Sequence, residues 1–249
     1  MQKLSIRRRT VLFAFAGMVA AASTPYAQTA ADTWPTKPVT IVVPYSAEGG
    51  TDIVAQRLSE LWEKPVVVDN RTGANGAIGS SYVAKSSPDG HTLLLVVGSH
   101  AINPVLMKSL PYDKAKAFTP VTRIAMSPMV MVASSKSPHK DLRDVLAAAH
   151  KEEVAIGYSE GQARLTGEMI RQAGGLKTIG IPNKGEAPTI VDIIGGHLPL
   201  GLTSVLTALP HIQSANLRVT GVAANERMAI FPAAMTFKEA GLQGVESLN

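Results

Sequence analysis

Two glycine-containing loops carry the residue types from which an anion-binding site can be built. The first loop has Gly49 and Gly50 followed directly by Thr51 and Asp52. Glycines allow a ligand to approach the backbone, and the N–H groups at the start of a following helix attract negative charge. The second loop, residues 69–76, is similarly rich in Asp, Asn, Arg and Gly. The pattern indicates an anion site, but a Gly-Gly pair is equally typical of a structural turn.

Both loops lie between a predicted strand and a predicted helix. Residues 39–43, VTIVV, are typical of a buried strand, and apolar residues then recur at helical spacing up to Trp62, with Thr51 or Asp52 as the expected N-cap. The same reasoning predicts further strands at 66–68, 92–97, 120–124, 129–133, 154–158, 178–181, 200–202 and 217–222. It predicts helices at 77–85, 142–150, 165–173, before the Gly195-Gly196 stop, and a short one at 237–242.

Alternating strands and helices favour mostly parallel sheets with right-handed crossovers. In such sheets ligands bind beyond the carboxyl ends of the strands, where both glycine loops are expected. The strand–helix pattern restarts after the segment around residue 129, so the sequence predicts two lobes with a cleft between them. The expected divisions are an export segment at 1–31, a first lobe at 32–128 and a second lobe at 129–249.

The N-terminal segment explains most of the positive charge of the chain. The 249 residues carry a formal charge of +5, and Lys3, Arg7, Arg8 and Arg9 supply four of these charges. A basic start, an apolar run from Val11 to Ala22 and small residues near Ala27 and Ala31 predict a cleaved signal peptide and a periplasmic protein. Without residues 1–31 the formal charge is +1, which gives no indication of a nucleic-acid partner. The route could be the general secretory one or the twin-arginine one.

Other kinds of site have weaker sequence support. The run Gly157-Tyr158-Ser159-Glu160-Gly161 matches the G-x-S-x-G turn of serine hydrolases, and Asp192 with His197 or His211 would complete the triad. That alternative requires the Ser159 hydroxyl to lie within hydrogen-bond reach of a histidine ring. The chain has no cysteine and its six histidines are scattered, so neither a metal nor a cofactor is expected.

A series of short segments occurs in the order in which one known family carries them. They are Trp34-Pro35 with Pro38, Val42–Tyr45, Gly49–Ala55, Val66–Arg71, Gly73–Gly76, Ser87–Leu94, Phe118–Val121, Lys184-Gly185 with Ala187-Pro188, Asp192 with Gly195-Gly196, Ala208–Ile212 and Glu239–Leu242. On these segments the chain resembles the tripartite tricarboxylate transporter receptors, also called Bug receptors. The resemblance covers nearly all of the chain after the signal peptide.

The resemblance implies an α/β fold with two lobes, similar to type II periplasmic binding proteins, in which parallel-rich sheets are flanked by helices and the ligand cleft lies between the lobes. It implies a non-catalytic monomer that captures a small organic carboxylate: a di- or tricarboxylate, an acidic amino acid or an aromatic acid. The expected partners are this solute and the membrane components of a tripartite transporter. A binding lobe used for sensing, or a remnant without transport, stays an alternative.

The resemblance also implies ligand contacts from both lobes. Carried over by position, they are Tyr45, Ala47, Gly50, Thr51, Asp52, Gly73, Ala74, Asn75, Ser159, Gly161, Lys184, Gly185 and Ser204. The chain departs from the family at Glu48, where a small residue is usual, at Arg164, which replaces a histidine, and at Asn183 and Pro199, which replace Tyr and Asp. Arg164 could pair with a ligand carboxylate. The family pattern also continues beyond residue 249, so we expect a truncated first lobe that lacks its return segment and exposes apolar surface.

Overall fold

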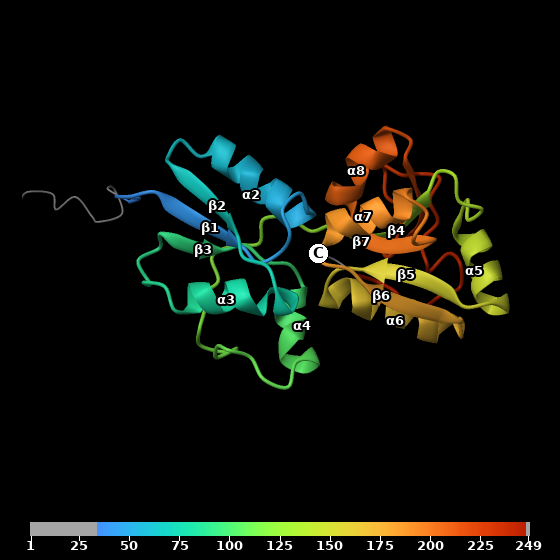
Figure 1. The fold of residues 1–249 in the computed structure, drawn as a ribbon, viewed down its shortest axis with the longest axis horizontal. Helices are drawn as coiled ribbons and strands as arrows, with labels where there is room; N and C mark the ends of the chain where they lie inside the picture. Colours follow the sequence, from blue (N-terminus) through green and yellow to red (C-terminus); the bar gives the residue numbers. More distant parts are fainter. Residues whose placement is uncertain (1–33, 248–249) are drawn as a thin grey trace, which may run out of the picture. The chain divides into compact units, whose positions relative to one another are not determined.

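The computed structural model describes residues 34–247, so the predicted signal peptide and Leu248-Asn249 lie outside the described residues. From Lys37 onward the chain forms one compact unit, which contains the two β-sheets drawn in Figure 1. Among the described helices, none is long and apolar enough to cross a membrane. The proposed boundary between a lobe at 32–128 and a lobe at 129–249 stays a prediction.

The first sheet is parallel throughout and has the strand order β2-β1-β3. Its strands are β1 (Val39–Val43), β2 (Val66–Asn70) and β3 (Thr92–Leu94). The accompanying helical elements are α2 (Gly50–Leu61), the 3-10 turn η2 (Ala74–Gly76), α3 (Ala77–Ala84) and α4 (Ser99–Leu106). Helix α2 packs against β1 and β2, whereas α3 packs against β1 and β3. The apolar run at 39–43 therefore forms the central strand, as its composition predicts.

The second sheet is mixed and has the strand order β6-β5-β7-β4-β8. Its strands are β4 (Met129–Ser134), β5 (Val154–Tyr158), β6 (Thr178–Pro182), β7 (Leu200–Ser204) and β8 (Leu217–Val222). Its helices are α5 (Leu142–Lys151), α6 (Gly161–Gly174), α7 (Glu186–Ile194) and α8 (Val205–Gln213). Strand β5 runs parallel to β6 and β7, but β4 is antiparallel to both β7 and β8. The parallel-rich α/β class is confirmed, with one antiparallel strand that the sequence did not predict.

Strand β4 separates two hydrophobic cores. Met129, Met131 and Ala133 belong to the core that contains residues of α5 and α6. Val130 and Val132 belong to the core that contains residues of α7 and α8. Because successive side chains of a strand point to opposite faces, an apolar residue at every position is what a doubly covered strand requires.

Several predicted elements differ from the structure. The segment 120–124 is not a strand; Val121 is 81% exposed, and residues 122–127 instead line a cavity described below. The segment 237–242 forms turns rather than a helix, and its first residue is joined to β8 by the hydrogen bond from Phe237 N to Val222 O (3.0 Å). Helix α2 begins at Gly50 with Gly49 as its N-cap and has no side-chain cap, so the prediction of Thr51 or Asp52 as the N-cap is wrong. Helix α6 begins at Gly161, four residues earlier than predicted.

Helix α5 has a side-chain cap whose removal is testable. The carboxylate of Asp141 accepts hydrogen bonds from the backbone N of Arg143 (2.8 Å) and of Asp144 (3.1 Å). We expect Asp141→Ala to lower the free energy of unfolding by about 1 kcal/mol, because two backbone donors lose their acceptor. Urea denaturation measures the change. Arg143→Ala is the control, since it alters an exposed side chain but leaves the cap in place; an equal loss in both variants would contradict the prediction.

Candidate ligand-binding site

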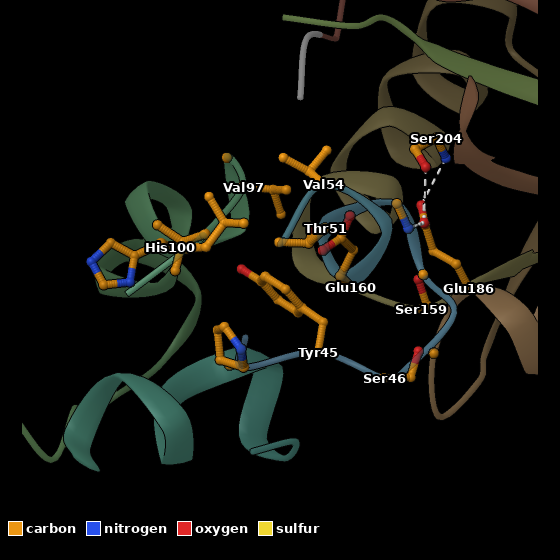
Figure 2. A pocket seen from close by; sticks show the side chains of 18 of the residues that line it. Tyr45, Ser46, Thr51, Val54, Val97, His100, Ser159, Glu160, Glu186 and Ser204 are labelled. Atoms are coloured by element: carbon orange, nitrogen blue, oxygen red, sulfur yellow. Dashed lines mark hydrogen bonds between the residues drawn. The ribbon is translucent and has the colours of Figure 1, made fainter. Parts of the chain in front are cut away.

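A cavity of about 980 Å³ lies at the carboxyl ends of strands from both sheets. Its walls come from the segments that follow β1, β2, β3, β5, β6 and β7, together with the extended segment 122–127. Figure 2 shows labelled side chains from the segments after β1, β3, β5, β6 and β7 around this space. Parallel strands end at one edge of a sheet and their helices begin there, so this edge collects backbone N–H groups and the positive ends of helix dipoles.

Most of the residues predicted to contact a ligand line this cavity. Those that do are Tyr45, Gly50, Thr51, Gly73, Ala74, Asn75, Ser159, Lys184, Gly185 and Ser204. Ala47, Asp52 and Gly161 are not among its lining residues. The structure thus brings together loops that lie far apart in the sequence, while actual contact of any of these residues with a ligand stays a prediction.

Asp52 holds the first glycine loop in place. Its side chain is buried (6% exposed), and its carboxylate accepts hydrogen bonds from Glu48 N (2.9 Å) and Asn70 Nδ2 (2.9 Å). Glu48 itself has a positive φ of 61° and is exposed, outside the cavity wall. The acidic side chain that departs from the family pattern at position 48 therefore does not face the cavity.

The second glycine loop has an unusual backbone. Ala74 and Asn75 both have positive φ values, 46° and 52°, which cost energy in residues other than glycine. The Asn75 side chain reaches across to the second sheet, where its Oδ1 accepts a hydrogen bond from Gly161 N (2.8 Å). A Cβ at position 161 would lie only 2.6 Å from Asn75 Nδ2, so Gly161 permits this approach. Gly161 thus fixes the second loop rather than lining the cavity.

Two buried acids in the wall were not predicted as site residues. Glu186, the first residue of α7, is 9% exposed, and its carboxylate accepts several hydrogen bonds described below. Glu160 is 8% exposed and accepts a hydrogen bond from Ser99 Oγ (3.2 Å). Burial raises the pKa of Glu160 to about 8, and the negative charge of Glu186 acts in the same direction. The sequence contains only a weak signal for these two acids. Each follows a strand and lies at the start of a helix, Glu160 as the N-cap of α6 and Glu186 as the first residue of α7.

The remaining wall is mainly apolar, with two cationic side chains among the described lining residues. Val54, Val97 and the ring of Tyr45 are among its lining residues, and Figure 2 shows their side chains. Burial raises the pKa of the Tyr45 phenol well above its ordinary value. The cations are Arg123 and Lys184. Arg164, considered earlier as a partner for a ligand carboxylate, lines a different cavity of about 290 Å³ next to β5 and β6.

The geometry lacks the hydrogen bond that the hydrolase alternative requires. In the part of the chain that the structure describes, the Ser159 hydroxyl makes no hydrogen bond to a histidine ring. Asp192 accepts a hydrogen bond from Asn183 Nδ2 (2.6 Å) instead of orienting a histidine side chain. Residues 34–247 also contain no cluster of His, Cys, Asp or Glu side chains suited to a metal ion.

Two β-sheets flanked by helices surround one mainly apolar cavity with their glycine loops and helix starts. Solved periplasmic binding proteins have this fold, among them BugD, which is 28% identical with a TM-score of 0.80 and coverage of 86% of this chain and 75% of that one. Within this class, the model of the tripartite tricarboxylate transporter family receptor matches residues 51–249. The chain belongs to this family.

Known proteins similar to this chain agree with the assignment. BugT of Bordetella pertussis is 35% identical over 242 residues, which cover 93% of this chain and 74% of BugT. A solved structure of an R. palustris protein with adipate is 32% identical, with a TM-score of 0.80, and the match covers 86% of this chain and 75% of that one. MatC from Rhodopseudomonas palustris with bound malate is 26% identical, with a TM-score of 0.77 and coverage of 86% and 76%.

Proposed function

We propose that this chain is a periplasmic, non-catalytic receptor that binds a small organic carboxylate in the 980 Å³ cavity and delivers it to the membrane components of a tripartite transporter. The observation that carries the proposal is the position of the cavity, at the carboxyl ends of strands from two sheets and beside the first residue of α2. Backbone N–H groups and hydroxyl groups at such a place suit a carboxylate without a metal. We further propose that the receptor acts as a monomer.

Family membership and the two solved relatives support this assignment. One relative was solved with adipate and the other with malate, and both ligands are small organic acids. The volume of the cavity is at the upper end of the range typical of small-molecule sites. Arg123 and Lys184 contribute positive charge to its wall, which favours an anionic solute.

The direct test is a binding screen of organic acids on the purified protein. We expect at least one mono-, di- or tricarboxylate to raise the melting temperature and to give a saturable isotherm in calorimetry, because a ligand that binds only the folded state stabilises it. Amides and alcohols of the same carbon skeletons serve as controls. A cooperatively folded protein that binds none of the acids would contradict the proposal.

Substitution of Asp52 tests whether the first glycine loop takes part in binding. We expect Asp52→Ala to weaken carboxylate binding by roughly 10-fold, because the loop between β1 and α2 loses the two hydrogen bonds that fix its conformation. Calorimetry with the best acid from the screen measures the change. Glu48→Ala is the matched control on the same loop, and its exposed side chain should leave affinity unchanged.

A further inference from the structure

The carboxylate of Glu186 already occupies an anion-binding position inside the cavity wall. Its Oε2 accepts hydrogen bonds from Gly50 N (3.1 Å) and from Ser204 Oγ (2.9 Å), and its Oε1 accepts one from Ser204 N (2.7 Å). The hydroxyl of Thr207 is a further hydrogen-bond partner of Oε2. Figure 2 shows Glu186 and Ser204 joined by two of these bonds at one side of the cavity.

These donors mark the starts of two helices. Gly50 is the first residue of α2, and Ser204 is the N-cap of α8, where its hydroxyl also accepts from Thr207 N (3.3 Å). The positive ends of both helix dipoles therefore converge on a negative charge that belongs to the protein itself. A carboxylate of the solute at this position would have to displace Glu186 or lie beside its charge, and like charges at short range repel strongly inside a protein.

In the described part of the chain, neither cation of the wall, Arg123 or Lys184, makes an ion pair with Glu186. Glu160 is a second buried acid in the same wall, and because its pKa is raised to about 8 it is mostly protonated at pH 7 and supplies no positive charge beside Glu186. Much of the rest of the wall is apolar, as the positions of Val54 and Val97 illustrate. One solute carboxylate can still be bound by other polar groups of the wall. These are the hydroxyl groups of Ser46, Thr51 and Ser159 and the cation of Lys184.

We propose that Glu186 is a specificity-determining residue that fills one carboxylate position of the cavity, so that this receptor selects acids with a single carboxylate and an apolar body over di- and tricarboxylates. This inference rests on the proposed function and narrows its solute class. The starts of α2 and α8 could otherwise bind a second solute carboxylate, but the carboxylate of Glu186 already neutralises them.

The test compares pairs of acids that differ only in the second carboxylate. Calorimetry at pH 7 on the purified protein uses hexanoate against adipate, butyrate against succinate, and benzoate against terephthalate. We expect the best-bound monocarboxylate to bind at least about 10-fold more tightly than its dicarboxylate counterpart, a difference of roughly 1.4 kcal/mol. Equal or tighter binding of the dicarboxylate by the wild-type protein would overturn the proposal.

Two variants then separate the role of the Glu186 charge from a general effect of lost charge. Glu186→Ala should bind the dicarboxylate counterpart of the best-bound monocarboxylate at least about 10-fold more tightly than the wild-type protein does. Glu48→Gln removes an exposed charge from the neighbouring loop and should leave the ratio of the two affinities unchanged. Circular dichroism and thermal unfolding verify that both variants are folded. If Glu186→Ala does not fold, Glu186→Gln replaces it. A folded variant at position 186 that keeps the wild-type preference for the monocarboxylate would overturn the assignment of the selectivity to Glu186.

The outcomes also distinguish this inference from the proposed function. Tight binding of dicarboxylates by the wild-type protein, with loss of that binding in Glu186→Ala, would leave the receptor assignment intact and overturn only the selectivity. Binding of no acid by a folded wild-type protein would overturn the receptor assignment, and the selectivity inference with it.

Discussion

Gly50→Val is expected to weaken carboxylate binding by on the order of 100-fold, the largest effect of any single substitution considered for this cavity. A Cβ at position 50 would collide with Ser204 Oγ and would lie 3.3 Å from Thr207 Oγ1. The start of α2 would have to move away from α8, and the hydrogen bond from Gly50 N to Glu186 Oε2 (3.1 Å) would be lost, so the cavity wall would be rearranged at this point. Calorimetry with the best acid from the screen measures the loss.

The controls for this substitution separate local collision from a general cost of replacing glycine. Gly50→Ala adds the Cβ alone and should already lower affinity. Gly167→Ala is the matched control within α6, since a Cβ there would meet only Leu202 Cδ1 at an ordinary 3.4 Å, and alanine favours the helix. Affinity within threefold of wild type for Gly50→Val would show that the packing of α2 against α8 beside the cavity has no part in binding.

The stability of the protein is expected to fall as the pH rises from about 5 to above 8, because Glu160 is buried. The pKa of Glu160 is raised to about 8 by burial and by the nearby charge of Glu186, although the hydrogen bond from Ser99 opposes the shift. The folded protein therefore holds a proton that the unfolded chain releases near its ordinary pKa of 4.5. The contribution of Glu160 to the free energy of unfolding is therefore fully present below pH 4.5 and is lost as the pH rises through the pKa of about 8 in the folded protein.

Urea denaturation at a series of pH values from 4.5 to 9 measures this loss, which we expect to be on the order of 4 kcal/mol. The matched variant is Glu160→Gln, which keeps the shape of the side chain but cannot ionise. Its unfolding free energy should lack the Glu160 contribution to the pH dependence. A wild-type protein and a Glu160→Gln variant with parallel pH profiles would contradict the assignment of this proton to Glu160.

The parts of the fold that the sequence predicts are those governed by local patterns. The strand at 39–43 and the strand at 154–158 agree with the structure residue for residue, because a short, mostly apolar run between turn residues has few alternatives. Helix α4 was not predicted; it has eight residues and contains Pro104. The antiparallel direction of β4 was missed because composition does not reveal strand direction.

The candidate site was predicted only as far as its loops. Glycines and short polar residues mark each loop at the end of a strand, so the segments around Gly50, Asn75 and Gly185 were found. The role of Glu186 was missed because it depends on a hydrogen bond between residues 136 positions apart, which no local pattern encodes. The contact between Asn75 and Gly161, 86 positions apart, was missed for the same reason.

In helix α7, the residue that lines the cavity and the residues that pack in the hydrophobic core are different. Glu186 at its start belongs to the wall of the cavity, while Ile190 and Ile193, one and two turns further along, are fully buried in the core. Exchange of the first residue can therefore alter which acid is recognised and leave the packed residues untouched. A single substitution at position 186 would change the charge of the cavity wall and leave the apolar contacts of Ile190 and Ile193 in place, so the solute preference of the receptor could evolve at this one position.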